Sequence, residues 1–142
     1  MVSGIRVISV AVVFGLGVTA VSPALAGDAA TVSVTEGHLV GNEGMSLYLF
    51  EPDERSASTC YDACAAAWPP LITDGAPKAE GDAKASLLGA AARKDGAMQV
   101  TYNGWPLYYF VKDEKPGDTV GRDKKGFGGE WYLVEPSGEA ME

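Results

Sequence analysis

A short sequence pattern occurs twice in this chain and constrains its fold more than any other feature. The stretch GMSLYLFEPD at 44–53 returns as GWPLYYFVKD at 104–113, with Gly, Leu, Tyr, Phe and Asp matched. Each copy runs on to a tryptophan, Trp68 in the first and Trp131 in the second. Self-similarity at a fixed interval is typical of proteins built from structural repeats. The matched positions are mostly apolar and aromatic, so the pattern predicts a duplicated core and names no reaction.

Both copies contain the spacing Tyr-x-aromatic-x-x-Asp. The motif residues are Tyr48, Phe50 and Asp53 in the first copy and Tyr108, Phe110 and Asp113 in the second. With TCYDACAAAWPPL at 59–71 and QVTYNGWPLYYF at 99–110, this motif resembles a family of small secreted or lipid-anchored bacterial proteins of unknown function. The resemblance to these tandem-repeat proteins covers nearly all of the chain after its N-terminal segment. Many members are lipoproteins, but here no cysteine lies at the processing site.

The first residues, 1–26, have the pattern of a secretory signal peptide. Arg6 precedes an apolar stretch at 7–21, and the small-residue sequence at 24–26 precedes Gly27. A transmembrane anchor needs about 20 apolar residues, and this stretch is shorter. We therefore expect an exported protein, periplasmic or extracellular, that has no lipid anchor and no transmembrane segment after cleavage.

Length and charge limit the remaining possibilities. Residues 27–142 suffice for one compact domain and are too few for two independent cores, so the repeats, at about 38–71 and 98–134, must share one core. The chain carries 19 acidic and 11 basic residues, a net charge of −8. Nucleic acids and anionic membranes bind clustered Lys and Arg, which this acidic chain lacks. We expect a monomer with an unknown envelope partner or small ligand.

Strand patterns dominate the mature chain. We expect strands at 31–35, 38–40, 46–51, 98–102, 106–111 and 131–134. Asn103-Gly104 is a strong hairpin signal between two of them. In 46–51 Tyr48 and Phe50 face one way and the two leucines the other, so this strand should be covered on both sides. The predicted fold is a small, mainly β, antiparallel domain built from two related hairpin repeats with one short helix.

Helical and irregular segments are fewer. Ser58 or Thr59 can cap a short helix that continues through Ala67 and stops at two prolines. The stretch 86–93 is ambiguous: its Leu and Ala residues favour helix, whereas the following Asp-Gly turn and the family resemblance favour strand. The stretch 74–85 has no periodicity and forms the expected seam between the repeats. Residues 137–142 have nothing to bury and should fray.

Cys60 and Cys64 are the only cysteines. In an oxidising compartment a lone pair usually crosslinks, and so small a loop contributes about 2 kcal/mol. We expect a structural disulfide. The alternative is a redox or metal dithiol, for which Met45, Met98 and His38 would be the further soft ligands of a copper site. Methionine at such positions is more often core filler, so we expect no cofactor.

Catalysis has few candidate groups. His38 is the only imidazole, and no Gly-x-Ser-x-Gly elbow accompanies it. Asp53 and Asp113 could pair across a pseudo-two-fold axis as catalytic carboxylates, but Asp after a strand more often ties off a turn. Tyr48 and Tyr108 lie on buried strands, so their hydroxyls need main-chain or Asp acceptors.

These observations favour a non-catalytic exported envelope protein, a binding or structural module. The alternative is a periplasmic redox or copper-handling protein that uses Cys60 and Cys64. Trp105, at a hairpin tip, is the best candidate for an exposed binding residue.

Overall fold

The computed structural model describes residues 28–142. The predicted signal peptide at 1–26 lies outside the described residues. Within 28–142 no helix is long and apolar enough to cross a membrane.

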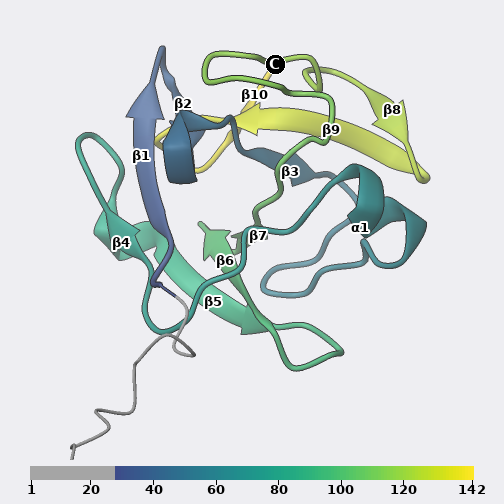
Figure 1. Ribbon diagram of the computed structural model, residues 1–142, viewed down its shortest axis with the longest axis horizontal. Coiled ribbons are helices and arrows are strands. Elements are labelled where there is room, and N and C mark those ends of the chain that lie inside the picture. Colours follow the sequence, from purple (N-terminus) through teal and green to yellow (C-terminus); the bar gives the residue numbers. More distant parts are fainter. Residues whose placement is uncertain (1–27) are drawn as a thin grey trace, which may run out of the picture.

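Short strands make up most of the described chain (Figure 1). The strands are β1 (Thr31–Thr35), β2 (His38–Val40), β3 (Tyr48–Phe50), β4 (Lys78–Ala79), β5 (Leu88–Ala92), β6 (Met98–Tyr102), β7 (Trp105–Pro106), β8 (Lys125–Gly126), β9 (Gly129–Val134) and β10 (Ala140–Met141). The helical elements are α1 (Ala63–Ala67) and the 3₁₀ turns η2 (Asn42–Gly44) and η3 (Ala85–Leu87).

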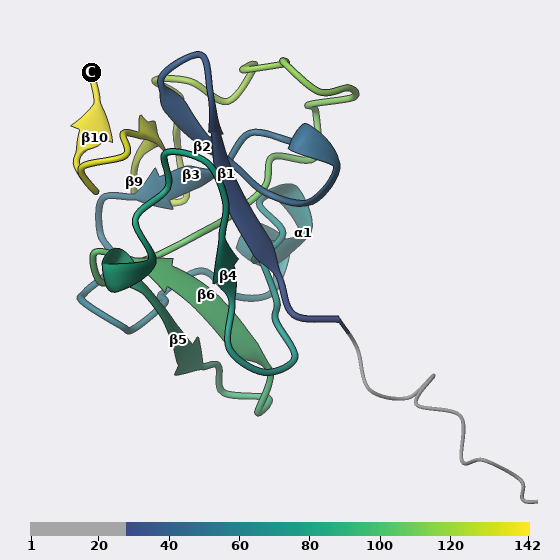
Figure 2. The ribbon, with the colours of Figure 1, turned by 90° about the vertical axis from the view of Figure 1, so that its left-hand side faces the viewer.

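The strands form three small sheets, ordered β2-β1-β4, β10-β9-β3 with β8 also on β9, and β5-β6-β7. All pairings are antiparallel except that of β1 with β4. In Figure 2 β1 and β4 lie side by side, and β5 with β6 form the lower part of the molecule. The mainly antiparallel β fold expected from the sequence is confirmed.

The two motif tyrosines meet at the centre of the fold. The Tyr48 amide donates to the Tyr108 carbonyl at 2.8 Å, and the Tyr108 amide donates to the Tyr48 carbonyl at 3.0 Å. Beyond this pair, Tyr48 lies opposite Leu133 of β9, and Tyr108 lies opposite Pro70. Each repeat therefore pairs its tyrosine segment with the segment that follows the tryptophan of the other repeat. The repeats are interleaved around a pseudo-two-fold axis.

The two faces of the segment 47–50, which contains β3, contact two different parts of the core. Leu47 and Leu49 belong to an aliphatic cluster, and Tyr48 and Phe50 belong to an aromatic cluster, as the alternation predicted. The aliphatic cluster comprises Ala30, Val32, Leu39, Leu47, Leu49, Leu71, Ala83, Val100, Tyr102, Leu107 and Val134. The aromatic cluster comprises Tyr48, Phe50, Cys60, Cys64, Trp68, Tyr108, Phe110, Trp131 and Leu133.

The helix differs from the one expected. It begins at Ala63, after Asp62 with a φ of 54°, and no side chain caps it. Ser58 and Thr59 cannot serve as caps because their side chains bind Tyr108 and Asp53. The prediction of a helix that starts at Ser58 or Thr59 was therefore wrong, since tertiary partners compete for the capping hydroxyls.

Three other segments resolve or correct the sequence reading. The ambiguous stretch 86–93 is mostly strand β5, preceded by the turn η3. The seam at 74–85 contributes β4, which pairs with β1 in parallel. The expectation that 137–142 frays was wrong: Ala140 and Met141 form β10, which pairs with Val134 and Leu133. β4 and β10 are held by main-chain hydrogen bonds, and no apolar periodicity in the sequence indicates these strands.

Candidate functional site

Four aromatic rings from the two repeats form one continuous stack in the aromatic cluster. Trp68 and Trp131 lie at the centre, with ring centroids 3.9 Å apart and an angle of 2° between their planes. Phe50 stacks on Trp131 at 4.2 Å, and Phe110 stacks on Trp68 at 4.1 Å. Each phenylalanine thus covers the tryptophan of the other repeat.

The motif tyrosines and aspartates are connected crosswise. The Tyr48 hydroxyl donates to Oδ2 of Asp113 at 2.7 Å, and the Tyr108 hydroxyl donates to Oδ2 of Asp53 at 2.6 Å. Neither tyrosine bonds the aspartate of its own motif. Because the two tyrosine segments pair around the pseudo-two-fold axis, each tyrosine hydroxyl lies beside the loop that follows the tyrosine segment of the other repeat.

The second oxygen of each aspartate holds that loop closed. Oδ1 of Asp53 accepts from the amide and hydroxyl of Thr59, at 2.8 and 2.7 Å. Oδ1 of Asp113 accepts from the Val120 amide at 2.8 Å. Both carboxylates therefore join their own loop to the tyrosine of the other repeat, and they do not act as a pair with each other.

The two tyrosine sites differ in their further partners. The Tyr48 hydroxyl accepts from the Gly121 amide at 3.2 Å. The Tyr108 hydroxyl contacts Oγ of Ser58 at 2.5 Å, and Ser58 in turn accepts from Arg93 at 3.1 Å. Arg93 also donates to Gln99 and to the Cys60 carbonyl, at 2.7 and 2.6 Å. A buried cation and a buried carboxylate are thus linked through two hydroxyls.

Burial shifts the ionisation of these groups. The pKa values of Asp53 and Asp113 are raised above their usual value, because loss of water disfavours the carboxylate more than the hydrogen bonds favour it. The pKa values of Tyr48 and Tyr108 are raised far above the ordinary value, because burial and the adjacent carboxylates both disfavour a phenolate. Both hydroxyls therefore stay protonated and remain donors over the physiological range.

The cysteines predicted to crosslink do so. Cys60 and Cys64 form a disulfide with a Cα separation of 5.2 Å. Cys60 lies before α1 and Cys64 within it, and both belong to the aromatic cluster. The bond joins the helix to the segment that precedes it within the aromatic cluster.

His38 finds a serine partner that the sequence did not reveal. His38 is buried and its Nε2 lies 3.0 Å from Oγ of Ser46. The Ser46 hydroxyl donates its own proton to the Asp118 carbonyl at 2.7 Å. In a serine hydrolase the imidazole accepts the proton of an accessible serine, whereas Ser46 and His38 are both buried. Burial lowers the pKa of His38, which favours the neutral ring.

The other candidate soft ligands come from different elements: His38 from β2, Met98 from β6 and Met45 from the position after η2. Met98 begins β6 and is partly exposed, and Met45 lines a surface hollow. Among residues 28–142 no three His, Cys, Asp or Glu side chains are placed to hold one metal ion. Trp105 is half-buried and packs against the aliphatic cluster, so the hairpin tip is not a projecting aromatic.

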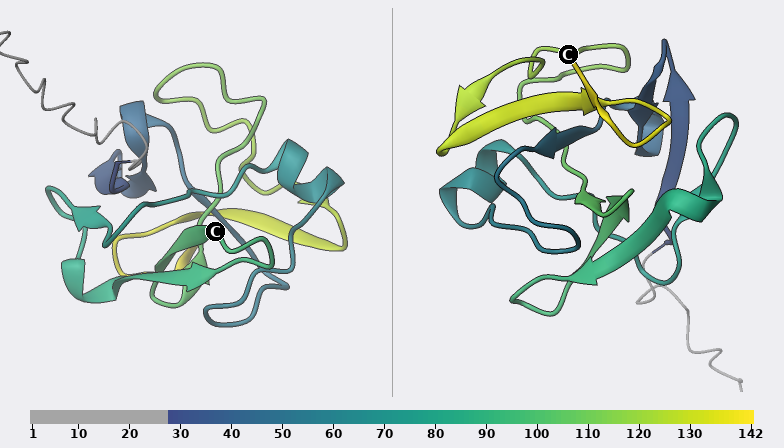
Figure 3. Two further views of the ribbon diagram at one scale, coloured as in Figure 1. Left: turned by 60° about the horizontal axis from the view of Figure 1, so that its bottom comes forward. Right: turned by 180° about the vertical axis from the view of Figure 1, so that it is seen from behind.

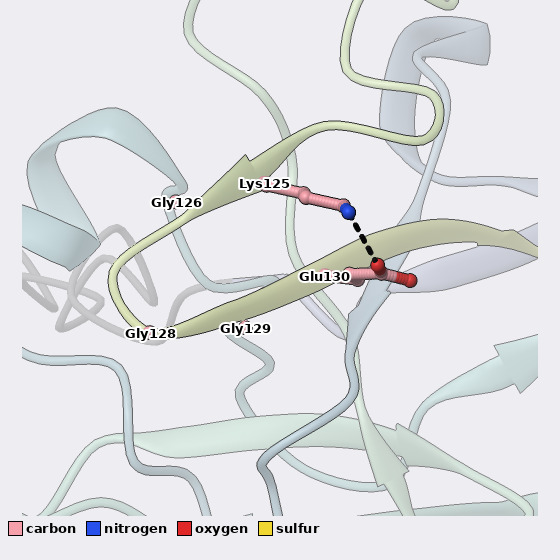
Figure 4. A pocket seen from close by; sticks show the side chains of 5 residues that line it. All are labelled: Lys125, Gly126, Gly128, Gly129 and Glu130. Carbon is pink, nitrogen blue, oxygen red and sulfur yellow. Dashed lines mark ion pairs between the residues drawn. The ribbon is translucent and has the colours of Figure 1, made fainter.

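Shallow hollows mark the surface of residues 28–142, among them the following two. One of about 420 Å³ lies along the hairpin of β8 and β9, where glycine backbone forms much of the lining and Lys125 pairs with Glu130 at 3.3 Å (Figure 4). The other, about 310 Å³, lies beside η2 and is lined by Asn42, Glu43, Met45, Tyr109, Phe110, Val111 and Asp113. Neither hollow exposes a tyrosine hydroxyl of the motif.

Sequence reasoning missed Arg93, Ser58 and Gln99 as parts of the site. Arg93 lies beside a predicted turn, where a basic residue is ordinarily solvated, yet it is 7 % exposed. Gly121 was missed as well. A Cβ atom there would lie 2.7 Å from Trp68 and 3.0 Å from Tyr48, so glycine is needed for the loop to approach the rings. No local pattern distinguishes these residues from ordinary loop or strand positions.

Comparison with known proteins identifies the repeat. A family model described as a secreted repeat of unknown function matches the chain twice, at residues 30–72 and 89–135. The first match starts at β1 and the second at β5, so each covers one of the interleaved halves. No curated protein and no solved structure shows a significant match. The chain belongs to the family of secreted repeats of unknown function, which is the kind of family expected from the sequence.

Proposed function

We propose that this protein is a non-catalytic, exported envelope module that binds its partner through its surface. The observation that carries the proposal is the closure of the repeated motif. Both motif hydroxyls and both oxygens of each motif carboxylate are engaged inside the protein. Within the part of the chain that the structure describes, no buried side-chain nitrogen or oxygen lacks a hydrogen-bond partner. These contacts support a folding role for the motif.

The remaining reactive groups support the same proposal. Both thiols are joined in the disulfide, and Ser46 and His38 are both buried. A nucleophile must be reached by its substrate, and Ser46 is only 1 % exposed. Membership of a secreted family supports export, and we further propose that the mature protein is an unlipidated monomer.

Metal content and free thiols of protein isolated natively from the cell envelope test the proposal. Metal-free protein without free thiols is the expected result. A stoichiometric metal, or titratable thiols at Cys60 and Cys64, would instead favour the redox or copper-handling alternative.

Variants of the motif give a second test. Tyr108→Phe and Asp53→Asn should lower stability but leave partner capture unchanged when it is measured well below the melting temperature. Loss of capture or of an activity in a variant that keeps its stability would make the motif a functional site and overturn the proposal.

A further inference from the structure

The two repeats differ at the outer edge of their first strand. β1 opens the first repeat and is flanked by β2 on one side and by β4 on the other. β5 opens the second repeat and, among residues 28–142, is flanked by β6 alone. In the first repeat a short extended segment therefore covers an edge that is bare in the second. The right-hand view of Figure 3 shows β5 along the lower rim of the molecule, with β6 on its inner side.

The direction of the free hydrogen-bonding groups follows from the β5–β6 register. The Arg93 amide donates to the Ala97 carbonyl, and the Asn103 amide donates to the Leu87 carbonyl. In an antiparallel pair such hydrogen-bonded positions alternate with positions whose groups point away. Ala90 and Ala92, opposite Val100 and Met98, occupy the second kind of position. Their amides and carbonyls point outward, and both residues are exposed.

β5 also lacks the features that usually protect an edge. Native edge strands are blunted by charged side chains, by proline or by short length. The other edge strands have such features: β4 contains Lys78, β7 contains Pro106 and β8 contains Lys125, and β2, β3 and β10 have three residues or fewer. β5, with the sequence LGAAA, is the longest edge strand of the described chain, and it has neither charge nor proline. Its small side chains leave room for a backbone to approach.

The contact between β1 and β4 indicates what such an edge accepts. The Lys78 amide donates to the Ala30 carbonyl and the Glu80 amide donates to the Val32 carbonyl, both at 2.8 Å. The added segment is extended, short and parallel, and it comes from a stretch without its own helix or hairpin. Main-chain hydrogen bonds supply the affinity in this mode of recognition.

We propose that the outer edge of β5 is a β-augmentation site that binds an extended peptide segment of an envelope protein partner. This inference rests on the proposed binding function and places the binding site on the edge of β5. The partner strand bonds the outward groups of Ala90 and Ala92, as β4 bonds β1 in the first repeat.

Site-specific photocrosslinking in the cell tests the site on the full exported chain. p-Benzoylphenylalanine replaces Ala92 on the edge or, as a control, Asp123 in the exposed loop before β8. Ala90→Pro removes the outward amide and is tolerated at an edge position, whereas Ala90→Ser keeps the amide. We expect an adduct from position 92, mapped to an extended partner segment. Ala90→Pro should lower its yield by about tenfold, the effect of one or two lost main-chain hydrogen bonds, and Ala90→Ser should not.

The other outcomes separate the two proposals. An adduct from position 123 alone, or one that Ala90→Pro leaves unchanged, would retain a binding module and overturn the β5 site. No adduct from either position would overturn both. If Ala90→Pro fails to fold, amide hydrogen exchange of the isolated wild-type protein tests the site instead. Fast exchange at Ala90 and Ala92 with slow exchange at Ala91 supports a vacant edge, and protection at all three contradicts it.

Discussion

Tyr48 donates its hydroxyl proton to Asp113, the aspartate of the other repeat, and not to the aspartate of its own motif. Tyr108 and Asp53 repeat this relationship in the opposite sense. The motif recurs in the sequence as a local unit, but its hydrogen bonds form only when both repeats are folded together. The motif therefore connects the two repeats.

A double-mutant cycle should detect this connection. Tyr48→Phe should lower the free energy of unfolding by about 1–3 kcal/mol, because Asp113 loses a buried partner. Combined with Asp113→Asn it should show a coupling energy of about 0.5 kcal/mol or more, whereas combined with Asp53→Asn it should be close to additive. Chemical denaturation of the single and double variants measures both the loss of unfolding free energy and the coupling energy. Stronger coupling within one motif than across the repeats would contradict the crosswise pairing.

A methyl group at Gly121 should disturb the ring stack. The added Cβ would lie 2.7 Å from Trp68, so Gly121→Ala should destabilise the protein by about 1–3 kcal/mol through overpacking. Gly126→Ala is the matched control, because nothing lies within 4 Å of a Cβ at that position. Thermal melts of the two variants compare them directly. Equal melting temperatures would show that the loop moves away from the rings at no cost.

High pH should unfold the protein through its buried tyrosines. The folded-state pKa values of Tyr48 and Tyr108 lie above the unfolded value of 10.0, so the folded state binds more protons above that pH. The free energy of unfolding should therefore fall as the pH rises beyond about 10. Phenolate absorbance should show these two tyrosines titrating only together with loss of structure. Tyr108→Phe should reduce the steepness, and reversible titration of all tyrosines in the folded state would contradict the expectation.

Mild acid should act through His38. Burial lowers its folded pKa below the unfolded value of 6.5, so the unfolded chain takes up the proton first. The free energy of unfolding should fall as the pH decreases through about 6.5, until the folded-state pKa is reached. Glu36, Asp113 and Arg122 are the charged groups that act on this ring. The raised carboxyl pKa values of Asp53 and Asp113 have the opposite effect, which extends from their folded-state values down to the ordinary value of 3.8. His38→Gln should reduce the decrease in the free energy of unfolding that occurs below about pH 6.5. An unchanged decrease in the variant would assign the effect to other groups.

The disulfide should contribute to stability and little else. Cys60→Ser with Cys64→Ser should give a folded protein that is less stable by about 2 kcal/mol, the value for a very short loop. Reduction of the wild-type protein by a dithiol should have a similar effect and provides the control. Full stability combined with loss of a metal or of electron-transfer activity would show that the thiols have a chemical role.

The sequence predicted the features that depend on local alternation and on duplication. The two faces of 46–51 follow from strict alternation, and the shared core follows from having too few residues for two cores. Two kinds of feature were beyond such reasoning. One is the choice of partner: spacing places Asp53 after its strand, but only tertiary packing brings Tyr108 to it. The other is structure made by backbone pairing alone, as in β10, where Ala140 and Met141 have no periodic signature.

Because the repeats are interleaved, neither repeat is expected to fold by itself. Because every tyrosine–aspartate bond and every contact between Phe and Trp in the stack joins the two halves, a single repeat in isolation would hold half of each contact. The stretch 74–85 keeps the halves at a high effective concentration, and in this respect it resembles the linker of a tethered dimer. Cleavage within that stretch would turn one folding reaction into an association of two fragments. Refolding would then depend on protein concentration, as it does for separate subunits.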